Sequence, residues 1–349
     1  MIHLHPPSSI FIQLHSFSYT FIHLLLPSST FIHLHTPSYT FIRLHPPSYT
    51  FIHLHTTPST FTTSIHLHKP SFTFMHLYSP SFTTIHLHTP SYTIMHLHSP
   101  LFTYIHFHST PPFTFMYLHT PLFTFIHLHP SSHNFIPSHT PSYTFYYLHT
   151  HSFNFIHLHT PSFIFIHLHS PSYTSIHLHT PSCTFIHLHP PSSSFMHLHP
   201  PSFTFIHLHS SSYTFIHLHT PLFTFIHLYS SSYTFIRTPS YTSIHLNAPS
   251  FIFIHFHSPS YTSIHLLTPS FTFIHLHPLS YTFIHLHTPL FTFIHFYSPS
   301  YTSIHLHTPS KRNFFCFHRC KSVNTSLLGY PCVFCFLTVG PSLSPEKKR

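Results

Sequence analysis

Acidic residues are almost absent from this sequence. Its 349 residues include one acidic side chain, Glu346, and only 3% of the chain is charged. Hydrolysis by paired carboxylates needs two Asp or Glu side chains, and magnesium or calcium sites need oxygen ligands that are usually carboxylates. A catalytic triad with an acidic orienting residue is excluded for the same reason. Because an acid, base and nucleophile constellation cannot be assembled, we expect no enzyme activity.

Glycine and long apolar runs are scarce as well. The two glycines, Gly329 and Gly340, both lie in the last segment, so the chain contains none of the Gly-rich motifs of phosphate-binding loops. No nucleotide or other small-molecule substrate is therefore expected. The longest apolar stretch of the tail, residues 327–339, contains Pro331 and is shorter than the roughly 20 residues of a membrane helix. No membrane span is predicted. The first ten residues lack the features of a signal peptide, and the sequence indicates no compartment.

Basic residues are few and unevenly placed. There are 10 Lys and Arg in total, and the tail holds Lys311, Arg312, Arg319, Lys347, Lys348 and Arg349. The rest of the chain therefore has no cationic stripe that could follow a phosphate backbone. No binding to nucleic acid is expected.

What the chain has in abundance is a tandem repeat. It contains 52 His, 44 Phe, 36 Pro and 20 Tyr, arranged in decapeptides such as Thr268–His277, which reads TPSFTFIHLH. Roughly thirty copies fill residues 1–310. Residues 311–349 form a non-repetitive, basic tail that contains four of the 5 Cys. The sequence thus predicts two regions, with a boundary near Ser310.

The consensus decapeptide can be encoded without guanine. Residue types that need guanine are sporadic before Lys311 and common after it. A guanine-poor DNA repeat of thirty bases would keep its reading frame while it is copied. Our leading hypothesis is therefore that the chain is the product of such a repeat and has no evolved biochemical function, since function depends on sites and none stands out.

Each decapeptide favours a β-strand. A seven-residue run such as Phe271–His277 is rich in strand-forming residues, and Pro recurs too often for helices. In a strand, Phe271, Phe273, His275 and His277 would share one face, and Thr, Ile and Leu the other. Because the repeat array lacks the glycines of tight turns, we expect a largely disordered or irregular extended, β-prone chain without a globular core. The alternative is a β-solenoid with two decapeptides in each coil.

Self-association is expected from the same composition. Uncharged seven-residue windows with high β-propensity are typical of aggregating segments, and the periodic Pro only partly opposes this. Protonation of the imidazoles would add up to 52 positive charges to the formal +9. The alternative functional hypothesis is therefore a histidine-rich, self-associating structural repeat whose solubility depends on pH.

Histidine is the one abundant residue with metal-binding chemistry. In an extended segment the two imidazoles of His-x-His lie on the same side, about 6 to 7 Å apart along the backbone. Two neutral imidazoles can ligate zinc, copper or nickel, but no carboxylate is available to orient the rings. We expect non-specific binding of these ions and no dedicated cofactor. Representative pairs are His157 and His159, His207 and His209, and His275 and His277.

The tail contains a second candidate metal site. Cys316, Cys320, Cys332 and Cys335 have the spacing C-x3-C-x11-C-x2-C, and four thiolates satisfy tetrahedral zinc. The usual motif pairs two C-x2-C knuckles, so chance clustering of these cysteines is the competing interpretation.

Overall fold

The structure is a computed structural model that describes residues 2–337 apart from short gaps. The gaps are 5–8, 16–17, 26–27, 36–37, 46–47, 56–61, 79–80, 109–112, 130, 150, 190, 200, 210, 220–221, 230, 239–240, 258–259, 278–280, 298–300, 308–312, 319–322 and 328–332. The chain divides into two compact units, Met1–Ser210 and Ser211–Arg349.

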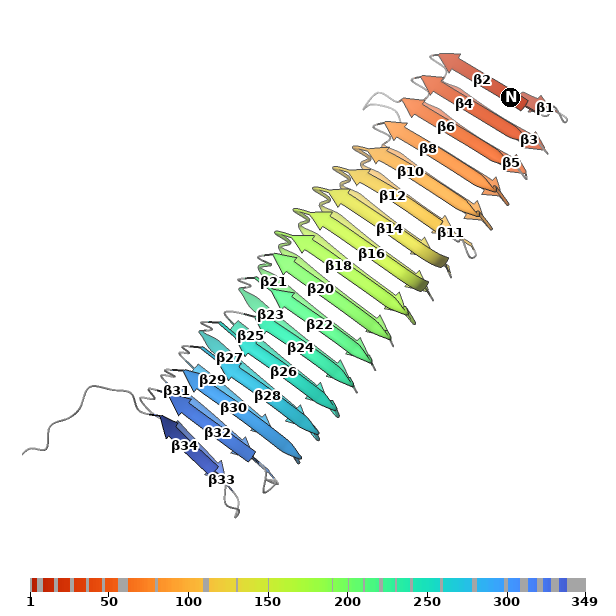
Figure 1. Ribbon diagram of the computed structural model, residues 1–349. Coiled ribbons are helices and arrows are strands. Elements are labelled where there is room, and N and C mark those ends of the chain that lie inside the picture. Colours follow the sequence, from red (N-terminus) through yellow and green to blue (C-terminus); the bar gives the residue numbers. More distant parts are fainter. Residues whose placement is uncertain are drawn as a thin grey trace, which may run out of the picture. The chain divides into compact units, whose positions relative to one another are not determined.

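The first unit consists of short strands only, one for almost every decapeptide (Figure 1). These strands are β1 (Ile2–Leu4), β2 (Ser9–His15), β3 (Tyr19–Leu25), β4 (Ser29–His35), β5 (Tyr39–His45), β6 (Tyr49–His55), β7 (Thr62–His68), β8 (Phe72–Tyr78), β9 (Phe82–His88), β10 (Tyr92–His98), β11 (Phe102–Phe107), β12 (Phe113–His119), β13 (Phe123–Leu128), β14 (Ser131–His139), β15 (Tyr143–His149), β16 (His151–His159), β17 (Phe163–His169), β18 (Tyr173–His179), β19 (Cys183–His189), β20 (Ser193–His199) and β21 (Phe203–His209).

The second unit has the same construction and includes three strands from the non-repetitive tail. Its strands are β22 (Tyr213–Leu218), β23 (Phe223–Tyr229), β24 (Tyr233–Thr238), β25 (Tyr241–Asn247), β26 (Phe251–Phe256), β27 (Tyr261–Leu267), β28 (Phe271–Leu276), β29 (Tyr281–Leu286), β30 (Phe291–Tyr297), β31 (Tyr301–Leu306), β32 (Asn313–His318), β33 (Val323–Leu327) and β34 (Val333–Leu337). The tail strand β32 pairs with β30, and β33 pairs with β31.

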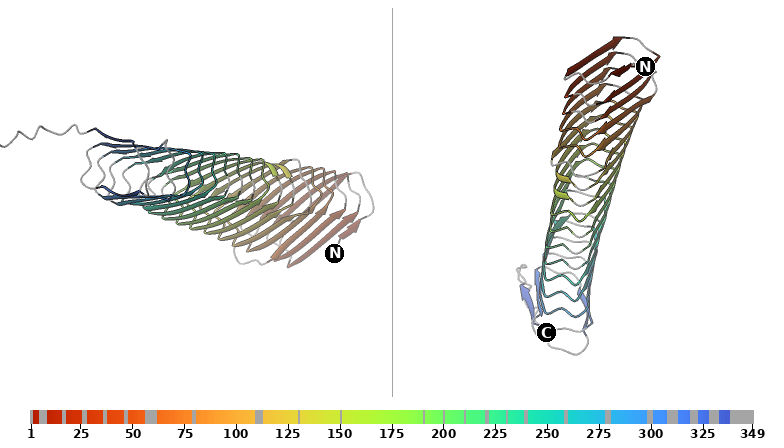
Figure 2. Two further views of the ribbon diagram at one scale, coloured as in Figure 1. Left: turned by 90° about the horizontal axis from the view of Figure 1, so that it is seen from below. Right: turned by 90° about the vertical axis from the view of Figure 1, so that its right-hand side faces the viewer.

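Within each unit, every strand pairs in parallel with the strand two positions away in sequence. Tyr19 lies beside Tyr39, and Ile156 lies beside Ile176, so one coil consists of two decapeptides. Odd-numbered strands form one sheet and even-numbered strands form the other, and the two sheets of a unit face each other (Figure 2). Where the repeat is longer than ten residues, the extra residues lie between strands. Tyr39 pairs with Thr62, and the pairs that follow, such as Ile42 with Ile65, keep equivalent repeat positions side by side.

The interior of each unit is built from the Thr, Ile and Leu of the repeat. In β18 the side chains of Thr174, Ile176 and Leu178 are fully buried, and those of β28 follow the same alternation. Burying one Ile or Leu side chain completely contributes about 1.5–3 kcal/mol, and each coil repeats this contribution. The predicted division of the strand into two faces is confirmed, and the face with aliphatic residues is the inner one.

The corners between strands rely on residues other than glycine. Among the residues that the structure describes, eleven non-glycine residues have positive φ, and each directly precedes a proline, as Thr160 does at φ 50°. The amide of Thr160 donates to the carbonyl of His179 at 2.7 Å, and Pro161, which has no amide to satisfy, is buried beside it. Hydrogen bonds between coils therefore hold these corners in a backbone region that Thr disfavours.

The expectation of a largely disordered chain without a packed core is wrong for the described residues. The β-solenoid alternative is confirmed, and the described residues contain no helix. That expectation gave too much weight to the missing glycines. Here Thr, Ser, Lys and Ala occupy the left-handed corner positions, and a continuous interior of Ile and Leu provides the compensating stability.

Buried threonine hydroxyls give a first testable prediction. The hydroxyls of Thr144 and Thr184 are buried without a hydrogen-bond partner, and Ile164 occupies the equivalent position on the strand between them. Thr184→Val should therefore raise the free energy of unfolding by about 1–3 kcal/mol, because an orphaned polar group is removed at nearly constant volume. Denaturant titration measures the change. Thr184→Ser is the control and should destabilise the protein; a Val variant that is less stable than the parent would refute the argument.

Candidate functional site: the histidine ladders

The histidines lie on the outer faces of both units, because they alternate with the buried Ile and Leu. We call the column formed by the first His of successive pairs the mid-strand ladder, and the column formed by the second His the end ladder. His157 and His177 of the mid-strand ladder stack with ring centroids 4.8 Å apart, and His159 and His179 of the end ladder do the same. This spacing matches the distance between neighbouring strands.

The other pairs chosen from the sequence are placed in the same way. His207 stacks on His187 at 4.7 Å, and His209 stacks on His189 at 4.5 Å. In the second unit His275 and His277 have ring centroids 5.6 Å apart. The prediction that the two imidazoles of a pair share one side of the strand is therefore confirmed, whereas the binding of metal to them stays a prediction.

Several imidazoles of the ladders have a lowered pKa, which favours their neutral form. Partial burial lowers the pKa of His177 below its ordinary value, and the neighbouring His157 and His197 lower it further. The pKa of His106 falls to about 4, because burial is reinforced by His127, His86, His108 and His129. The neutral imidazole is the form that ligates metal ions.

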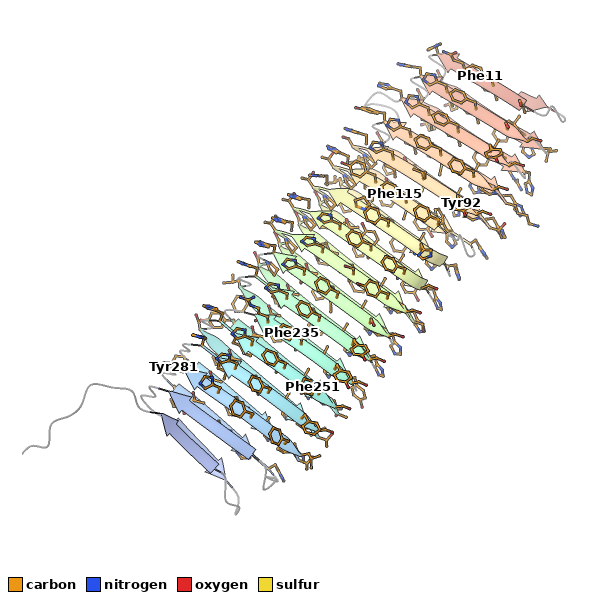
Figure 3. All side chains as sticks on the ribbon, viewed as in Figure 1. Phe11, Tyr92, Phe115, Phe235, Phe251 and Tyr281 are labelled. Atoms are coloured by element: carbon orange, nitrogen blue, oxygen red, sulfur yellow. The ribbon has the colours of Figure 1, made fainter. Side chains whose placement is uncertain are left out.

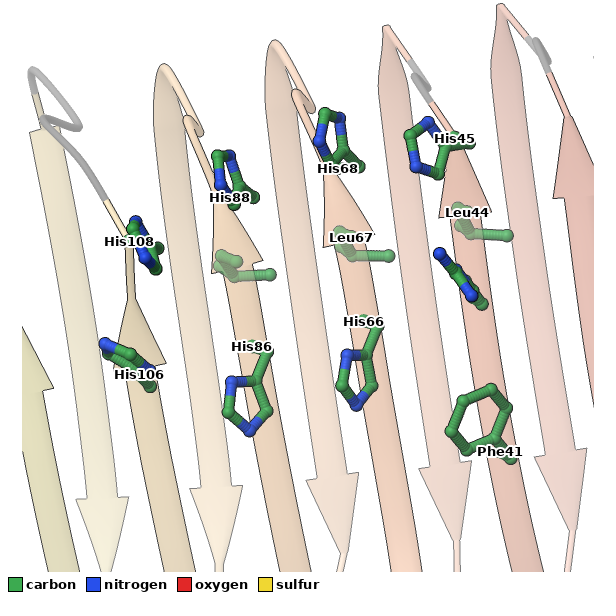
Figure 4. A pocket seen from close by; sticks show the side chains of 12 residues that line it. Phe41, Leu44, His45, His66, Leu67, His68, His86, His88, His106 and His108 are labelled. Carbon is green, nitrogen blue, oxygen red and sulfur yellow. The ribbon is translucent and has the colours of Figure 1, made fainter.

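One part of the ladders in the first unit is hollowed into a groove. It has a volume of about 340 Å³ and runs across β5, β7, β9 and β11. Its lining combines Arg43 with seven imidazoles: His45 of β5, His66 and His68 of β7, His86 and His88 of β9, His106 of β11, and His108, which follows β11 (Figure 4). No acidic side chain lines this groove.

Aromatic rings form further rows beside the histidines. Phe115 stacks with Phe135 at 5.2 Å in the first unit, and Phe235 with Phe215 at 4.8 Å in the second (Figure 3). Near the first strands, Phe11 is 65% exposed and Tyr19 is 77% exposed. The outer surfaces therefore present many apolar ring edges together with the imidazoles.

A serine and a histidine make a hydrogen-bonded contact at one corner. The Oγ of Ser170 lies 3.2 Å from the Nδ1 of His169. Activation of a serine nucleophile also needs a group that orients the imidazole and donors that stabilise an oxyanion. No such orienting carboxylate occurs among the described residues, because the one acidic residue of the chain is Glu346. The contact has the geometry of a surface hydrogen bond.

The proposed cysteine site falls partly outside the described residues. Cys316 in β32 and Cys335 in β34 are register partners on neighbouring strands. Cys320 and Cys332 lie in the gaps 319–322 and 328–332. The zinc hypothesis for the tail therefore stays a prediction.

No family model, curated protein or solved structure matches this chain. The site is therefore argued from its own geometry. Throughout the described part of the chain, no group of three or more His, Cys, Asp or Glu could hold a metal ion. The same residues include no helix that is long and apolar enough to cross a membrane.

The sequence alone did not predict the distances between imidazoles of successive coils. The in-strand separation follows from the His-x-His pattern, but stacking such as that of His33 on His53 at 4.7 Å depends on the strand register. The signal that could have indicated it is the repeat itself: a coil of two decapeptides puts every second copy side by side.

Proposed function

We propose that this chain is a non-catalytic, histidine-rich structural repeat that binds divalent transition-metal ions with low specificity and responds to pH. The observation that carries the proposal is the pairing of half-buried imidazoles on the outer face, as in His127 and His129, whose ring centroids lie 5.3 Å apart with planes at 39°. Two imidazoles at this distance can reach one ion from the same strand.

Low specificity follows from the surroundings of the rings. Selective metal sites orient their imidazoles through carboxylates or carbonyls that accept the other ring N–H. The repeat array contains no Asp or Glu at all. Zinc, copper and nickel should therefore all bind, in the order set by their general affinity for nitrogen ligands.

Self-association belongs to the same proposal. Exposed Phe and Tyr rings such as Phe11 and Tyr19 offer apolar area to a second copy, and the net charge at pH 7 is low for a chain of this size. Protonation of the imidazoles would add repulsion between copies and favour separate chains.

Metal binding to the whole chain is the direct test. At pH 7.5, equilibrium dialysis against Ni²⁺ or Zn²⁺ followed by elemental analysis should give several bound ions per chain. At pH 4.5 the number should fall steeply, because protons compete for the ring nitrogens. Apo protein at the same two pH values serves as the blank. Less than one bound ion per chain at pH 7.5 and saturating metal would overturn the proposal.

The origin of the sequence in a DNA repeat remains the companion hypothesis, in which metal binding has no selected role. Imperfections of the interior and corners support it. Tyr146 is fully buried with no hydrogen-bond partner for its hydroxyl, and corners such as Thr140 have positive φ where glycine would be favoured. Codon usage tests it: identical third bases from copy to copy indicate recent duplication, whereas silent changes under a constant peptide indicate selection.

A further inference from the structure

The groove across β5, β7, β9 and β11 contains a positive charge where the repeat normally has histidine. Arg43 of β5 occupies the mid-strand position, between His23 of β3 and His66 of β7. Its side chain is exposed and lines the groove. The one acidic residue of the chain, Glu346, lies outside the described residues. Within the described part of the chain, the guanidinium therefore has no carboxylate to pair with.

Two small side chains account for the shape of the groove. Ser64 of β7 and Thr84 of β9 lie between Phe41 and Tyr104 in one column of register partners. The ring of His66 lies 5.5 Å from that of Phe41, with the planes at 30°. Because Ser64 and Thr84 carry no ring, the mid-strand imidazoles have room to tilt away from the end ladder. The space between the two ladders is thereby opened.

The lining combines apolar surface with hydrogen-bond donors. Leu44, Leu67 and Leu87 line the groove, and Figure 4 shows Leu67 between the rings of His66 and His68. A neutral imidazole keeps one ring N–H, and a guanidinium has five N–H donors. The volume of about 340 Å³ lies within the range of pockets that bind small molecules. Such a lining suits a flat apolar body that carries an anionic group.

The electrostatics of the groove also favour an anion. Burial and the neighbouring imidazoles lower the pKa of His66 and His68, and the positive charge of Arg43 lowers both further. Lys69, which directly follows β7, adds to this effect at His68. Each positive charge thus opposes the protonation of its neighbours, and no described acidic group offsets it. A bound anion would supply the missing negative charge.

We propose that this groove binds an aryl phosphate, that is, a phosphate group carried on a flat aromatic ring, as a ligand rather than a substrate. The guanidinium of Arg43 donates two parallel N–H···O hydrogen bonds to the phosphate, a geometry that its planar fork favours. The aromatic ring lies over Leu44 and Leu67, between the two ladders. This inference goes beyond the proposed function and needs no bound metal.

The test is calorimetric titration of the metal-free full chain with phenyl phosphate at pH 7.5. Phenyl phosphate should bind about tenfold more tightly than inorganic phosphate, because its ring covers apolar surface. Arg43→His should weaken the binding of phenyl phosphate by about tenfold, because the charge-assisted hydrogen bonds are lost. Histidine is the usual residue at this position of the repeat. If Arg43→His does not fold, Arg43→Gln replaces it, since Gln13 occupies the equivalent position on β2.

Two further variants locate the site. Arg237→His is the matched control, because Arg237 occupies the same mid-strand position on β24, between His217 and His255. It should leave the affinity unchanged. Ser64→Phe combined with Thr84→Phe should weaken binding by about tenfold, because the added rings close the space into which the imidazoles tilt.

The outcomes separate this inference from the proposed metal binding. If Arg43→His or the double Phe variant, each with unchanged circular dichroism, binds phenyl phosphate as the parent does, the groove is not the site. Equal affinity of the parent for phenyl phosphate and inorganic phosphate would overturn the role of the aromatic ring. An equal loss in Arg237→His would show that binding follows overall charge. None of these results bears on metal binding, because the protein is titrated without metal.

Discussion

Acidification from pH 7.5 to pH 4 is expected to unfold both units. Ladder histidines such as His177 and His275 have a pKa that burial and neighbouring imidazoles lower in the folded protein, while the unfolded chain titrates near the ordinary value of 6.5, so protons bind preferentially to the unfolded state as the pH falls. The stability from neutral imidazoles is complete above about pH 6.5. It is lost progressively between that pH and the folded-state pKa, which for His106 is about 4.

The size of this effect comes from the number and spacing of the groups. The chain has 52 His and one acidic residue, so almost nothing neutralises the new charges. Stacked imidazoles such as His187 and His207 lie 4.7 Å apart, within one Debye length at physiological salt. A protonated ring therefore lowers the proton affinity of the next ring. The ladders can be fully protonated only when the solenoid unfolds.

Circular dichroism and light scattering against pH measure the transition. We expect β-structure to disappear between about pH 6.5 and 4, together with dissolution of any assembled material at acid pH. Replacing His157, His177 and His197 with Tyr should move the midpoint to lower pH, because Tyr does not charge there; Tyr117 and Tyr147 already occupy ladder positions. A solenoid that keeps its full β-signal at pH 4 would contradict the electrostatic argument.

Glycine at the corners is expected to stabilise the first unit substantially. Thr120, Thr140, Thr160 and Thr180 have φ between 46° and 50°, a region that costs a β-branched residue about 1–3 kcal/mol. Each donates its amide to a histidine carbonyl of the next coil, at 2.6 to 2.8 Å. Glycine keeps this hydrogen bond and removes the clash of Cβ.

The expected gain is about 1 kcal/mol for each corner, because the larger backbone entropy of unfolded glycine offsets part of the relief. The four corners lie side by side on successive coils, because each amide bonds to the residue that precedes the next corner, so their contributions are coupled rather than additive. A variant with all four Thr→Gly changes should be more stable by about 1–4 kcal/mol. Guanidinium unfolding of the parent and the variant measures this difference.

Alanine at the same four corners provides the matched control. It retains Cβ and should give little or none of the gain. Equal effects of Gly and Ala would mean that the side chains beyond Cβ, rather than the backbone conformation, limit stability. A glycine variant less stable than the parent would show that these corners are not strained.

Much of the candidate site could be inferred from residue order alone. The alternation of the strand puts His275 and His277 on one side, and their ring centroids lie 5.6 Å apart. Contacts between coils could not be inferred, because they depend on which strands pair: His106 of β11 and His129, which follows β13, belong to neighbouring coils, and their ring centroids lie 6.2 Å apart.

The sequence by itself determined the strands, their boundaries at Thr-Pro-Ser and the two faces of each strand, because backbone geometry fixes an alternation of two and proline interrupts pairing. It could not decide which face is inner, since neither is clearly polar, or whether the strands assemble. The tertiary structure decided both. Branched aliphatic side chains such as Ile176 and Leu178 fill the space between two facing sheets. Phe and His rings outside stack at nearly the spacing of parallel strands, a contact that exists only once the coils are in register.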